Sequence, residues 1–292
     1  MEEQPHTDNS SSLSIGLALS GGGARGILHI GVFKALAELG IQPDYISGTS
    51  AGSIAGTLLA QGYAPEDMMA FIEETSLYSL FSLKMPSLGL TDLSNLRKKL
   101  KQYIPHNDIA ALGIPTYVAV SNLNNGMIEY RNSGPLDQIV AASCTIPLLF
   151  KPIQMDGSMY VDGGLLANAP VAPLHQHCDL IITVNLVPLV AIETKEMSGM
   201  VNLLQRCFDL AALNNIKPQL NYSDIIIEPR ELHEYSRFNL KKARDLFDLG
   251  YQATMQVAEE ISTKIQWKLK QKVDESLVSK INETASGSSL VS

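Results

Sequence analysis

Cysteine, long hydrophobic runs and basic residues are all scarce in this sequence. The three cysteines, Cys144, Cys178 and Cys207, are widely spaced and odd in number. They fit neither a disulfide framework nor a zinc site, so we interpret them as reduced packing residues. No apolar run reaches the roughly 18 residues that a membrane-spanning helix requires. Residues 1–12 are polar and lack the basic stretch and apolar core of a secretory signal, so we expect a disordered lead-in there.

The balance of charge is acidic. Lysine and arginine number 22 and aspartate and glutamate number 30, which gives a formal net charge of −8 at pH 7. A protein that binds the nucleic-acid backbone needs the opposite sign, so we expect no nucleic-acid partner. We expect a cytoplasmic location, either free or peripheral to a membrane. Apolar residues make up 45% of the chain, which is enough to fill a substantial core.

The first 62 residues alternate between strand and helix patterns. A short apolar strand at Ile15–Ser20 is followed by a stretch of helical spacing to Leu39, which Gly40 ends. A second strand begins at Pro43, and a helix follows it up to Gly62. This order predicts a parallel sheet joined by right-handed crossovers.

The rest of the chain predicts hairpins, further strands and long helices. The pairs Asn125-Gly126 and Asp156-Gly157 lie between short strand patterns and predict tight turns. We then expect a strand at Leu180–Asn185, a helix over 200–216, a strand at Asp224–Glu228 and a helix from about Leu240 to Lys270. No linker divides these elements, which predicts a single domain over residues 13–272. The composition after it predicts a disordered tail over 273–292.

Residues 48–52 read Gly48-Thr49-Ser50-Ala51-Gly52, a G-x-S-x-G pentapeptide between the second strand and its helix. In this context the pentapeptide builds a nucleophile elbow, a sharp turn that lifts the serine hydroxyl out of the sheet. The N-terminus of the next helix directs N–H groups and the positive end of its dipole at the same point, where an oxyanion would be stabilised. The alternative is an ordinary small-residue turn between strand and helix.

A second glycine cluster, Gly21-Gly22-Gly23-Ala24-Arg25-Gly26, follows the first strand. Its glycines also match the G-x-G-x-x-G fingerprint of dinucleotide-binding proteins. That fingerprint expects an acidic residue at the end of the second strand, where this chain has the serine turn instead, and Asp44 lies before that point. We therefore favour another use, in which consecutive N–H groups hold an oxyanion beside Ser50. Arg25 either braces this loop or faces a substrate phosphate.

A serine acts as a nucleophile only with a base within hydrogen-bond distance. The sequence has six histidines, and none has a glycine or turn context that would present it to Ser50. Asp162 does have one, because it ends the strand Met159–Val161 and is followed by Gly163 and Gly164. The sequence therefore favours Asp162 as the partner of Ser50.

In their order along the chain, the glycine cluster, the serine pentapeptide and Asp162-Gly163-Gly164 resemble the signature of the patatin-like phospholipase family. Between them, Ala142-Ser143-Cys144-Thr145-Ile146-Pro147 is similar to the alanine-serine stretch that precedes the aspartate in that family. The resemblance covers roughly residues 13–230, and in size and spacing the chain looks like the compact bacterial members. Where members often carry Thr-Asp after the third strand, this chain has Ser121-Asn122, which leaves any role of that position open.

The resemblance implies a three-layer α/β/α fold with a mainly parallel central sheet. It also implies a serine lipid acyl hydrolase of the phospholipase A or lysophospholipase type, with lipid acyl esters as substrates and no metal or cofactor. Ser50 would be the nucleophile and Asp162 the general base. Because the reference pKa of an aspartate is about 4, Asp162 would have to be partly desolvated to act as a base at neutral pH.

The remaining residues of the implied site are backbone elements. The candidate oxyanion donors are N–H groups of Gly21, Gly22, Gly23, Ala24, Arg25, Gly26 and Ala51, with Gly22, Gly23 and Ala51 as the expected contacts. Gly48, Gly52, Gly163 and Gly164 would shape the turns that carry the two reacting side chains.

Two other interpretations stay open at this point. One is an α/β-hydrolase triad in the chain order Ser50, Asp162 and then His175 or His177. The other is a patatin-like module without catalytic activity that binds lipid or a protein partner.

Two further segments bear on the substrate. Residues 77–88 are apolar and irregular, as an acyl-chain groove or lid would be, or a loop packed on the core. Farther along, one helix face consists of Leu93, Leu96, Leu100 and Tyr103, and the other carries Arg97, Lys98, Lys99 and Lys101. The basic face predicts either a contact with anionic lipid or a solvated surface.

Overall fold

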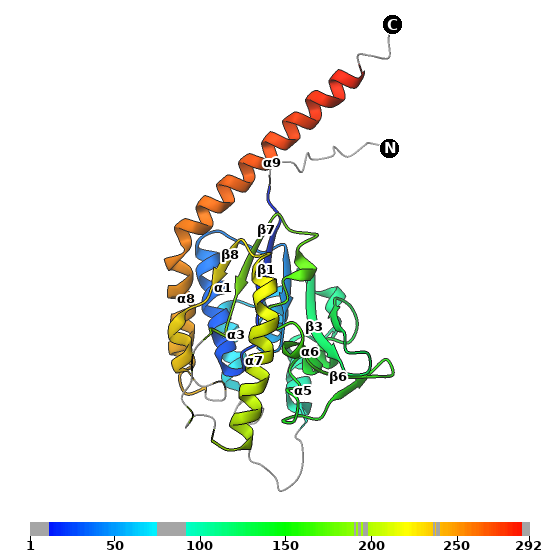
Figure 1. Ribbon diagram of the computed structural model, residues 1–292, viewed down its shortest axis with the longest axis vertical. Helices are drawn as coiled ribbons and strands as arrows, with labels where there is room; N and C mark the ends of the chain where they lie inside the picture. Colours follow the sequence, from blue (N-terminus) through cyan, green and yellow to red (C-terminus); the bar gives the residue numbers. More distant parts are fainter. Residues whose placement is uncertain are drawn as a thin grey trace.

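The computed structural model describes residues 12–74, 92–189, 191, 194, 198–235, 237 and 240–287. At its centre is an eight-stranded sheet in the order β5-β6-β3-β2-β1-β7-β8, with β4 also paired to β3 (Figure 1). The strands are β1 Ile15–Leu19, β2 Tyr45–Gly48, β3 Thr116–Asn122, β4 Ile128–Arg131, β5 Ile153–Met155, β6 Ser158–Asp162, β7 Leu180–Val184 and β8 Ile225–Ile227. The pairs among β1, β2, β3, β7 and β8 are parallel, whereas β4 and β6 pair with β3, and β5 with β6, in antiparallel fashion.

Helices cover both faces of this sheet, so the expected three-layer α/β/α architecture with a mainly parallel sheet is confirmed. The helices are α1 Ile27–Glu38, α2 Ala51–Ala60, α3 Pro65–Glu74, α5 Ser94–Tyr103, α6 Leu136–Ser143, α7 Met200–Leu220, α8 Ala243–Gln256 and α9 Ala258–Gly287. None of these described helices combines the length and the apolar character needed to cross a membrane.

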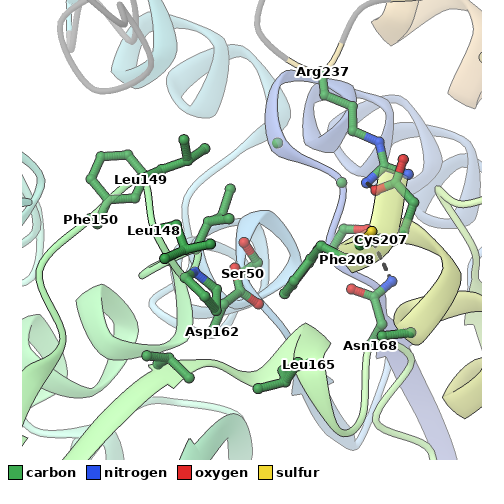
Figure 2. Close-up of a pocket in the computed structure, with 18 of the residues that line it drawn as sticks. Ser50, Leu148, Leu149, Phe150, Asp162, Leu165, Asn168, Cys207, Phe208 and Arg237 are labelled. Carbon is green, nitrogen blue, oxygen red and sulfur yellow. Dashed lines mark hydrogen bonds and ion pairs between the residues drawn. The ribbon is translucent and has the colours of Figure 1, made fainter. Parts of the chain in front are cut away.

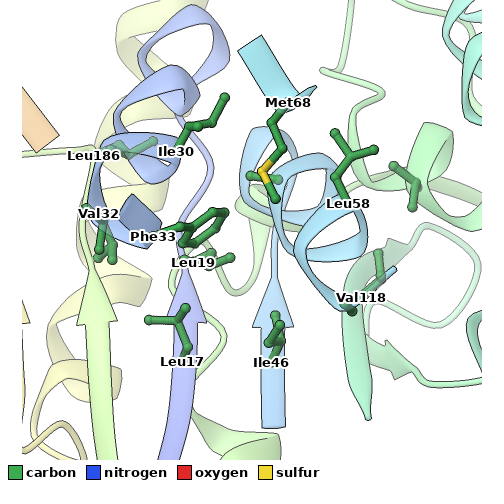
Figure 3. Packing of buried hydrophobic residues seen from close by; sticks show 14 of the residues in the cluster. Leu17, Leu19, Ile30, Val32, Phe33, Ile46, Leu58, Met68, Val118 and Leu186 are labelled. Atoms are coloured by element: carbon green, nitrogen blue, oxygen red, sulfur yellow. The ribbon is translucent and has the colours of Figure 1, made fainter. Parts of the chain in front are cut away.

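The larger core lies between the sheet and the helices on one face. Leu17 and Leu19 of β1 point to the same side, because side chains two residues apart share a face of a strand. Together with Ile46 of β2 they pack against Phe33 of α1 and Leu58 of α2 (Figure 3). This packing fixes the ends of β1 and β2 beside each other, where the two glycine-containing motifs begin.

A smaller core lies on the opposite face. Ala18 of β1 and Ile181 of β7 point to that side and pack with Leu174, which lies just before β7. Leu213 and Ile216 of α7 belong to a neighbouring apolar cluster. α7 is therefore held next to the chain segment that follows β6.

The C-terminal part differs from the sequence prediction. The helix expected from about 240 to 270 is divided in two, because Val257 leaves the helical backbone with φ −102° and ψ 10°. α9 then continues to Gly287 and extends away from the sheet in Figure 1. α9 contains no proline, and its only glycine is its last residue, Gly287, so no residue type that ends helices occurs near residue 272. The domain boundary predicted at residue 272 therefore lies inside this helix. Residues 77–88 and the predicted lead-in up to residue 11 lie outside the described residues.

Candidate active site

Ser50 forms the turn between β2 and α2 that the sequence predicts. Its backbone has φ 52° and ψ −122°, a conformation that residues other than glycine rarely adopt. The Ser50 N–H donates a hydrogen bond to Oγ of the buried Ser143 at 2.8 Å. At position 52 a Cβ would lie 2.2 Å from the carbonyl oxygen of Leu19, so the turn admits only Gly52 there. Strain of this kind persists only where the surroundings enforce it, and it is concentrated at functional sites.

Asp162 lies directly beside Ser50, at the carboxyl end of β6 (Figure 2). The side chain of Asp162 is buried, with 1% exposed, and that of Ser50 is 8% exposed. One carboxylate oxygen of Asp162 accepts the Gly164 N–H at 2.7 Å. The Ser50 hydroxyl is close enough to lower the pKa of this carboxyl. The Ser121 hydroxyl, at the position that departs from the family pattern, donates to the Asp162 carbonyl at 2.9 Å.

The surroundings of Asp162 make it a much stronger base than a solvated aspartate. Burial raises the pKa of Asp162 from its ordinary value of 3.8 to about 7. The Gly164 N–H, the Ser50 hydroxyl and the charge of Arg237 act in the opposite direction but do not cancel the effect of burial. A carboxylate with this pKa is poised for proton transfer near neutral pH.

The glycine loop after β1 lies against the serine turn. Gly21, Gly22 and Gly23 line the same cavity as Ser50. The Gly21 N–H donates to the Asn168 carbonyl at 3.1 Å and the Ala24 N–H to the Arg237 carbonyl at 2.8 Å, so neither of these two donors is free. Among the described residues, the hydrogen bonds include none from the N–H groups of Gly22, Gly23 and Ala51.

The rest of the predicted oxyanion loop turns away from the cavity. Gly26 allows the loop to pack on α2, since a Cβ there would lie 2.5 Å from the Ala51 Cβ. Arg25 extends to the far side of the loop and donates to the carbonyls of Tyr235 at 2.8 Å, His233 at 3.4 Å and Leu186 at 3.5 Å. Burial lowers the pKa of Arg25 to about 10, with a smaller effect of nearby positive charge. The geometry thus favours the bracing role over the substrate-facing role for this arginine.

A cavity of about 510 Å³ opens at Ser50 and Asp162. Figure 2 shows Leu148, Leu149 and Phe150 on one side of the two residues and Phe208 of α7 on the other. These walls are apolar and therefore suited to a hydrocarbon chain rather than to a charged ligand.

One ion pair interrupts the apolar wall. Arg237 pairs with Asp209 of α7, and both line the cavity near the glycine loop. Burial lowers the pKa of the Arg237 guanidinium and raises that of the Asp209 carboxyl, while each charge offsets part of the effect on the other. Within this pair, each charge offsets part of the cost of removing the other from water.

Sequence reasoning missed the contribution of α7 to this cavity. Cys207, Phe208, Asp209 and Ala211 all belong to that helix and line the cavity, yet they form no recognisable motif. The helix itself is predicted, but nothing local says which face meets the site. Cys207 is exposed, so its interpretation as a packing residue is wrong, whereas Cys144 is buried beside Ser50 and Asp162.

The histidines of the alternative triad lie far from Ser50 along the strands. The His177 ring stacks on Tyr45 with centroids 5.1 Å apart, and its Nε2 is 3.1 Å from the Tyr117 hydroxyl. Tyr45 begins β2 and Tyr117 lies near the start of β3, whereas Ser50 follows the end of β2. The arrangement therefore does not bring His177 to the serine. The neighbouring His175 packs on Tyr222 instead, with ring centroids 5.0 Å apart.

The acidic residue considered for dinucleotide binding is also at the wrong end of the sheet. Asp44 accepts the Ile15 N–H at 2.7 Å, at the start of β1, whereas the glycine loop follows the end of that strand. A ribose bound at the loop would be out of its reach, so the geometry does not favour a dinucleotide site.

Comparisons with known proteins identify the family of this chain and its fold. The family model described as patatin-like phospholipase matches residues 17–175. An uncharacterized NTE family protein of Mycobacterium tuberculosis is 32% identical over 180 residues, which cover 61% of this chain and 50% of that protein. A lysophospholipase of Emericella nidulans, nte1, is 30% identical over 245 residues, which cover 80% of this chain and 16% of that protein. The chain thus spans about half the length of the mycobacterial relative and a much smaller share of the fungal one.

A solved structure supports the fold alone. VipD from Legionella pneumophila aligns with a TM-score of 0.50 at 17% sequence identity, covering 85% of this chain and 67% of that chain. The family model is the stronger finding, because its match covers more than half of the 292 residues and includes the glycine loop, Ser50 and Asp162. The chain therefore belongs to the patatin-like phospholipase family.

Proposed function

We propose that this protein is a serine hydrolase of lipid acyl esters, with Ser50 as the nucleophile and Asp162 as the general base. The observation that carries the proposal is that the two side chains lie next to each other in one cavity (Figure 2). Ser50 is held in a left-handed turn, and its partner is a buried carboxylate whose pKa is raised to about 7. Covalent catalysis by a serine requires a nearby base whose pKa lies close to the pH at which the enzyme works.

The reaction follows from this geometry. Ser50 Oγ attacks the carbonyl carbon of the ester while Asp162 takes the hydroxyl proton. The negative charge that develops on the carbonyl oxygen is stabilised by the N–H groups of Gly22, Gly23 and Ala51. The tetrahedral intermediate collapses, the ester C–O bond breaks, and the leaving alcohol takes the proton from Asp162. Asp162 then accepts a proton from water, whose oxygen attacks the acyl carbon, and that proton returns to Ser50 as the fatty acid leaves.

The substrate class rests on the cavity and on the relatives together. The apolar walls on both sides of Ser50 suit an acyl chain, and no cofactor is required by the steps above. The family model is described as a patatin-like phospholipase, and the similar Emericella nidulans protein is named a lysophospholipase. We therefore propose phospholipids and lysophospholipids as substrates.

The proposal is tested by hydrolysis and by covalent labelling. The full chain is assayed with p-nitrophenyl esters and with mixed phospholipids, and a fluorophosphonate probe is mapped by peptide mass spectrometry. We expect ester turnover and labelling at Ser50. A module without catalytic activity would give neither, and labelling at another serine would contradict the assignment.

The pH dependence follows from the environment of Asp162. We expect kcat/KM for a neutral soluble ester to rise with pH and to level off above a midpoint near pH 7, because only the ionised carboxylate accepts the Ser50 proton. Below the midpoint, activity falls about tenfold for each pH unit. A pH–rate profile over the folded range checks this, and a midpoint near the ordinary aspartate value of about 4 would contradict it.

We also propose that the cavity mouth contacts a lipid surface. Leu203 and Leu210 of α7 are 46% and 49% exposed, and they flank Cys207, which lines the cavity. Across the cavity, Leu148 is 62% exposed. Leucines around the opening would let an acyl chain pass from the lipid surface to the cavity without meeting water.

The basic face of α5 supports this contact less than the sequence indicates. The apolar side packs as predicted, with Leu96 and Leu100 buried. On the other side, Arg97 and Lys101 both pair with the buried Asp137 of α6. Part of the predicted positive surface is therefore neutralised within the chain.

The contact is tested with the double variant Leu203→Ser/Leu210→Ser. We expect hydrolysis of phospholipid vesicles to fall by about tenfold, because two half-exposed leucines no longer leave water on docking. Hydrolysis of a short soluble ester is expected to stay within twofold of the wild type. Met255→Ser, at a position 37% exposed on α8, is the control. An equal loss on vesicles with the control variant would rule out this surface.

A further inference from the structure

The loop 163–168, which follows Asp162, contacts more than the acid. Within the loop, the Gly164 N–H donates to the Asp162 carboxylate at 2.7 Å. The hydroxyl of Thr49, the residue before the proposed nucleophile, donates to the Ala167 carbonyl at 2.8 Å. The loop therefore bonds to the acid at one end and to the serine turn at the other.

The same loop also holds the glycine loop. Gly21 and Asn168 exchange two hydrogen bonds: the Gly21 N–H donates to the Asn168 carbonyl at 3.1 Å, and the Asn168 side-chain amide donates to the Gly21 carbonyl at 3.3 Å. The junction is tightly packed, since a Cβ on Gly21 or on Gly164 would lie 2.6 Å from the Asn168 Oδ1 and would displace that amide. The loop 163–168 is thus the common support of the acid, the serine turn and the proposed oxyanion donors.

A single side chain of α7 fastens this loop at both ends. The half-buried Asn215 donates from Nδ2 to the carbonyls of Gly164 at 3.0 Å and Leu165 at 3.2 Å. Its Oδ1 accepts the Asn168 N–H at 2.8 Å. Three bonds engage both the donor and the acceptor of one carboxamide, which fixes its orientation. Asn215 lies beyond residues 17–175, the part of the chain that matches the family model.

We propose that Asn215 is a positioning residue that sets the loop 163–168, and through it the carboxylate of Asp162, relative to the glycine loop. This inference rests on the proposed function, in which Asp162, Ser50 and the glycine loop take part in one reaction. Such alignment matters, since a displacement of about 1 Å in a reacting group costs on the order of a hundredfold in rate. The loop reads Gly163-Gly164-Leu165-Leu166-Ala167-Asn168, and its two glycines leave the backbone next to Asp162 with little conformational restraint of its own.

The test compares Asn215→Ala and Asn215→Leu with Asn214→Ala. Asn214 is the same residue type on the same helix, but it is exposed. We expect both Asn215 variants to lower kcat on a soluble ester by about 10- to 100-fold. KM should stay within about threefold, because the apolar walls of the cavity are untouched. Loss of the ordered Gly164 bond should also move the midpoint of the pH–rate profile upward, and Asn214→Ala should behave as the wild type.

Hydrogen–deuterium exchange gives a readout that does not depend on catalysis. We expect faster exchange in peptides that contain residues 163–168 and 20–26 of both Asn215 variants, with α1 unchanged. Wild-type values of kcat and of the pH midpoint in these variants would overturn the proposal, as would exchange that rises equally through α1. If the wild type hydrolyses no ester and reacts with no probe, the proposed function fails, and the exchange pattern still decides whether Asn215 holds the two loops together.

Discussion

Replacing Ser50 with alanine is expected to lower kcat/KM for ester substrates by about 10⁴-fold or more, because the attacking oxygen is removed. The cavity walls and the glycine loop are unchanged, so substrate binding should persist and KM should move only a few-fold. Ester hydrolysis and fluorophosphonate labelling measure the loss, and labelling at position 50 should vanish. Thermal unfolding is measured alongside, since the left-handed backbone at this position strains alanine as it does serine.

The control for this variant is Ser262→Ala, which removes an exposed hydroxyl of α9 that donates only to a carbonyl of its own helix. It should keep wild-type activity and labelling. Retention of more than about a tenth of the activity by Ser50→Ala would assign the chemistry to another nucleophile.

Asp162→Asn is expected to lose activity and to gain stability. Asparagine cannot accept the Ser50 proton, so kcat should fall by about 10³-fold or more. The pKa of Asp162 in the folded protein, about 7, exceeds its ordinary value of 3.8, so the folded state binds this proton more tightly than the unfolded chain does. The stability of the wild type therefore decreases as the pH rises between these two values. Above about pH 7 the cost reaches up to about 4 kcal/mol, and asparagine does not incur it.

Chemical denaturation of the two proteins at several pH values measures this difference. The free energy of unfolding of Asp162→Asn should exceed that of the wild type near neutral pH, and the two should converge near pH 4. Asp156→Asn serves as the matched control, because this aspartate also precedes a glycine but lies in an exposed hairpin turn. The double variant His175→Ala/His177→Ala should stay active. An active Asp162→Asn together with an inactive histidine variant would favour the triad instead.

The parts of the site that carry a local pattern could be predicted from the sequence. The elbow at Ser50 is recognisable because a strand, a glycine-bounded turn and a helix follow one another within a few residues. Asp162 stands out because two glycines follow it at the end of a strand. Since β1 and β2 are parallel neighbours, the ends of both strands meet at one edge, and the glycine loop arrives next to the serine without further information.

The parts that depend on tertiary contact could not be predicted. Phe208 and Asn215 lie in an unremarkable helical pattern, and only the docking of α7 shows that they face the site. Arg237 comes from a stretch without any motif, and its role depends on a partner 28 residues away, Asp209. The pKa of Asp162 likewise follows from burial, which no spacing of residues reveals.

The two walls of the cavity come from different parts of the sequence, which affects which substitutions can alter the shape of the cavity. The reacting atoms and the wall with Leu148 come from residues before 175, whereas the opposing wall comes from α7 and Arg237. One wall of the cavity thus comes from a later stretch of the chain than Ser50, Asp162 and the other wall. On the proposed function, exchanges at Phe208 or Ala211 should change which acyl-chain length fits and leave Ser50 and Asp162 in place.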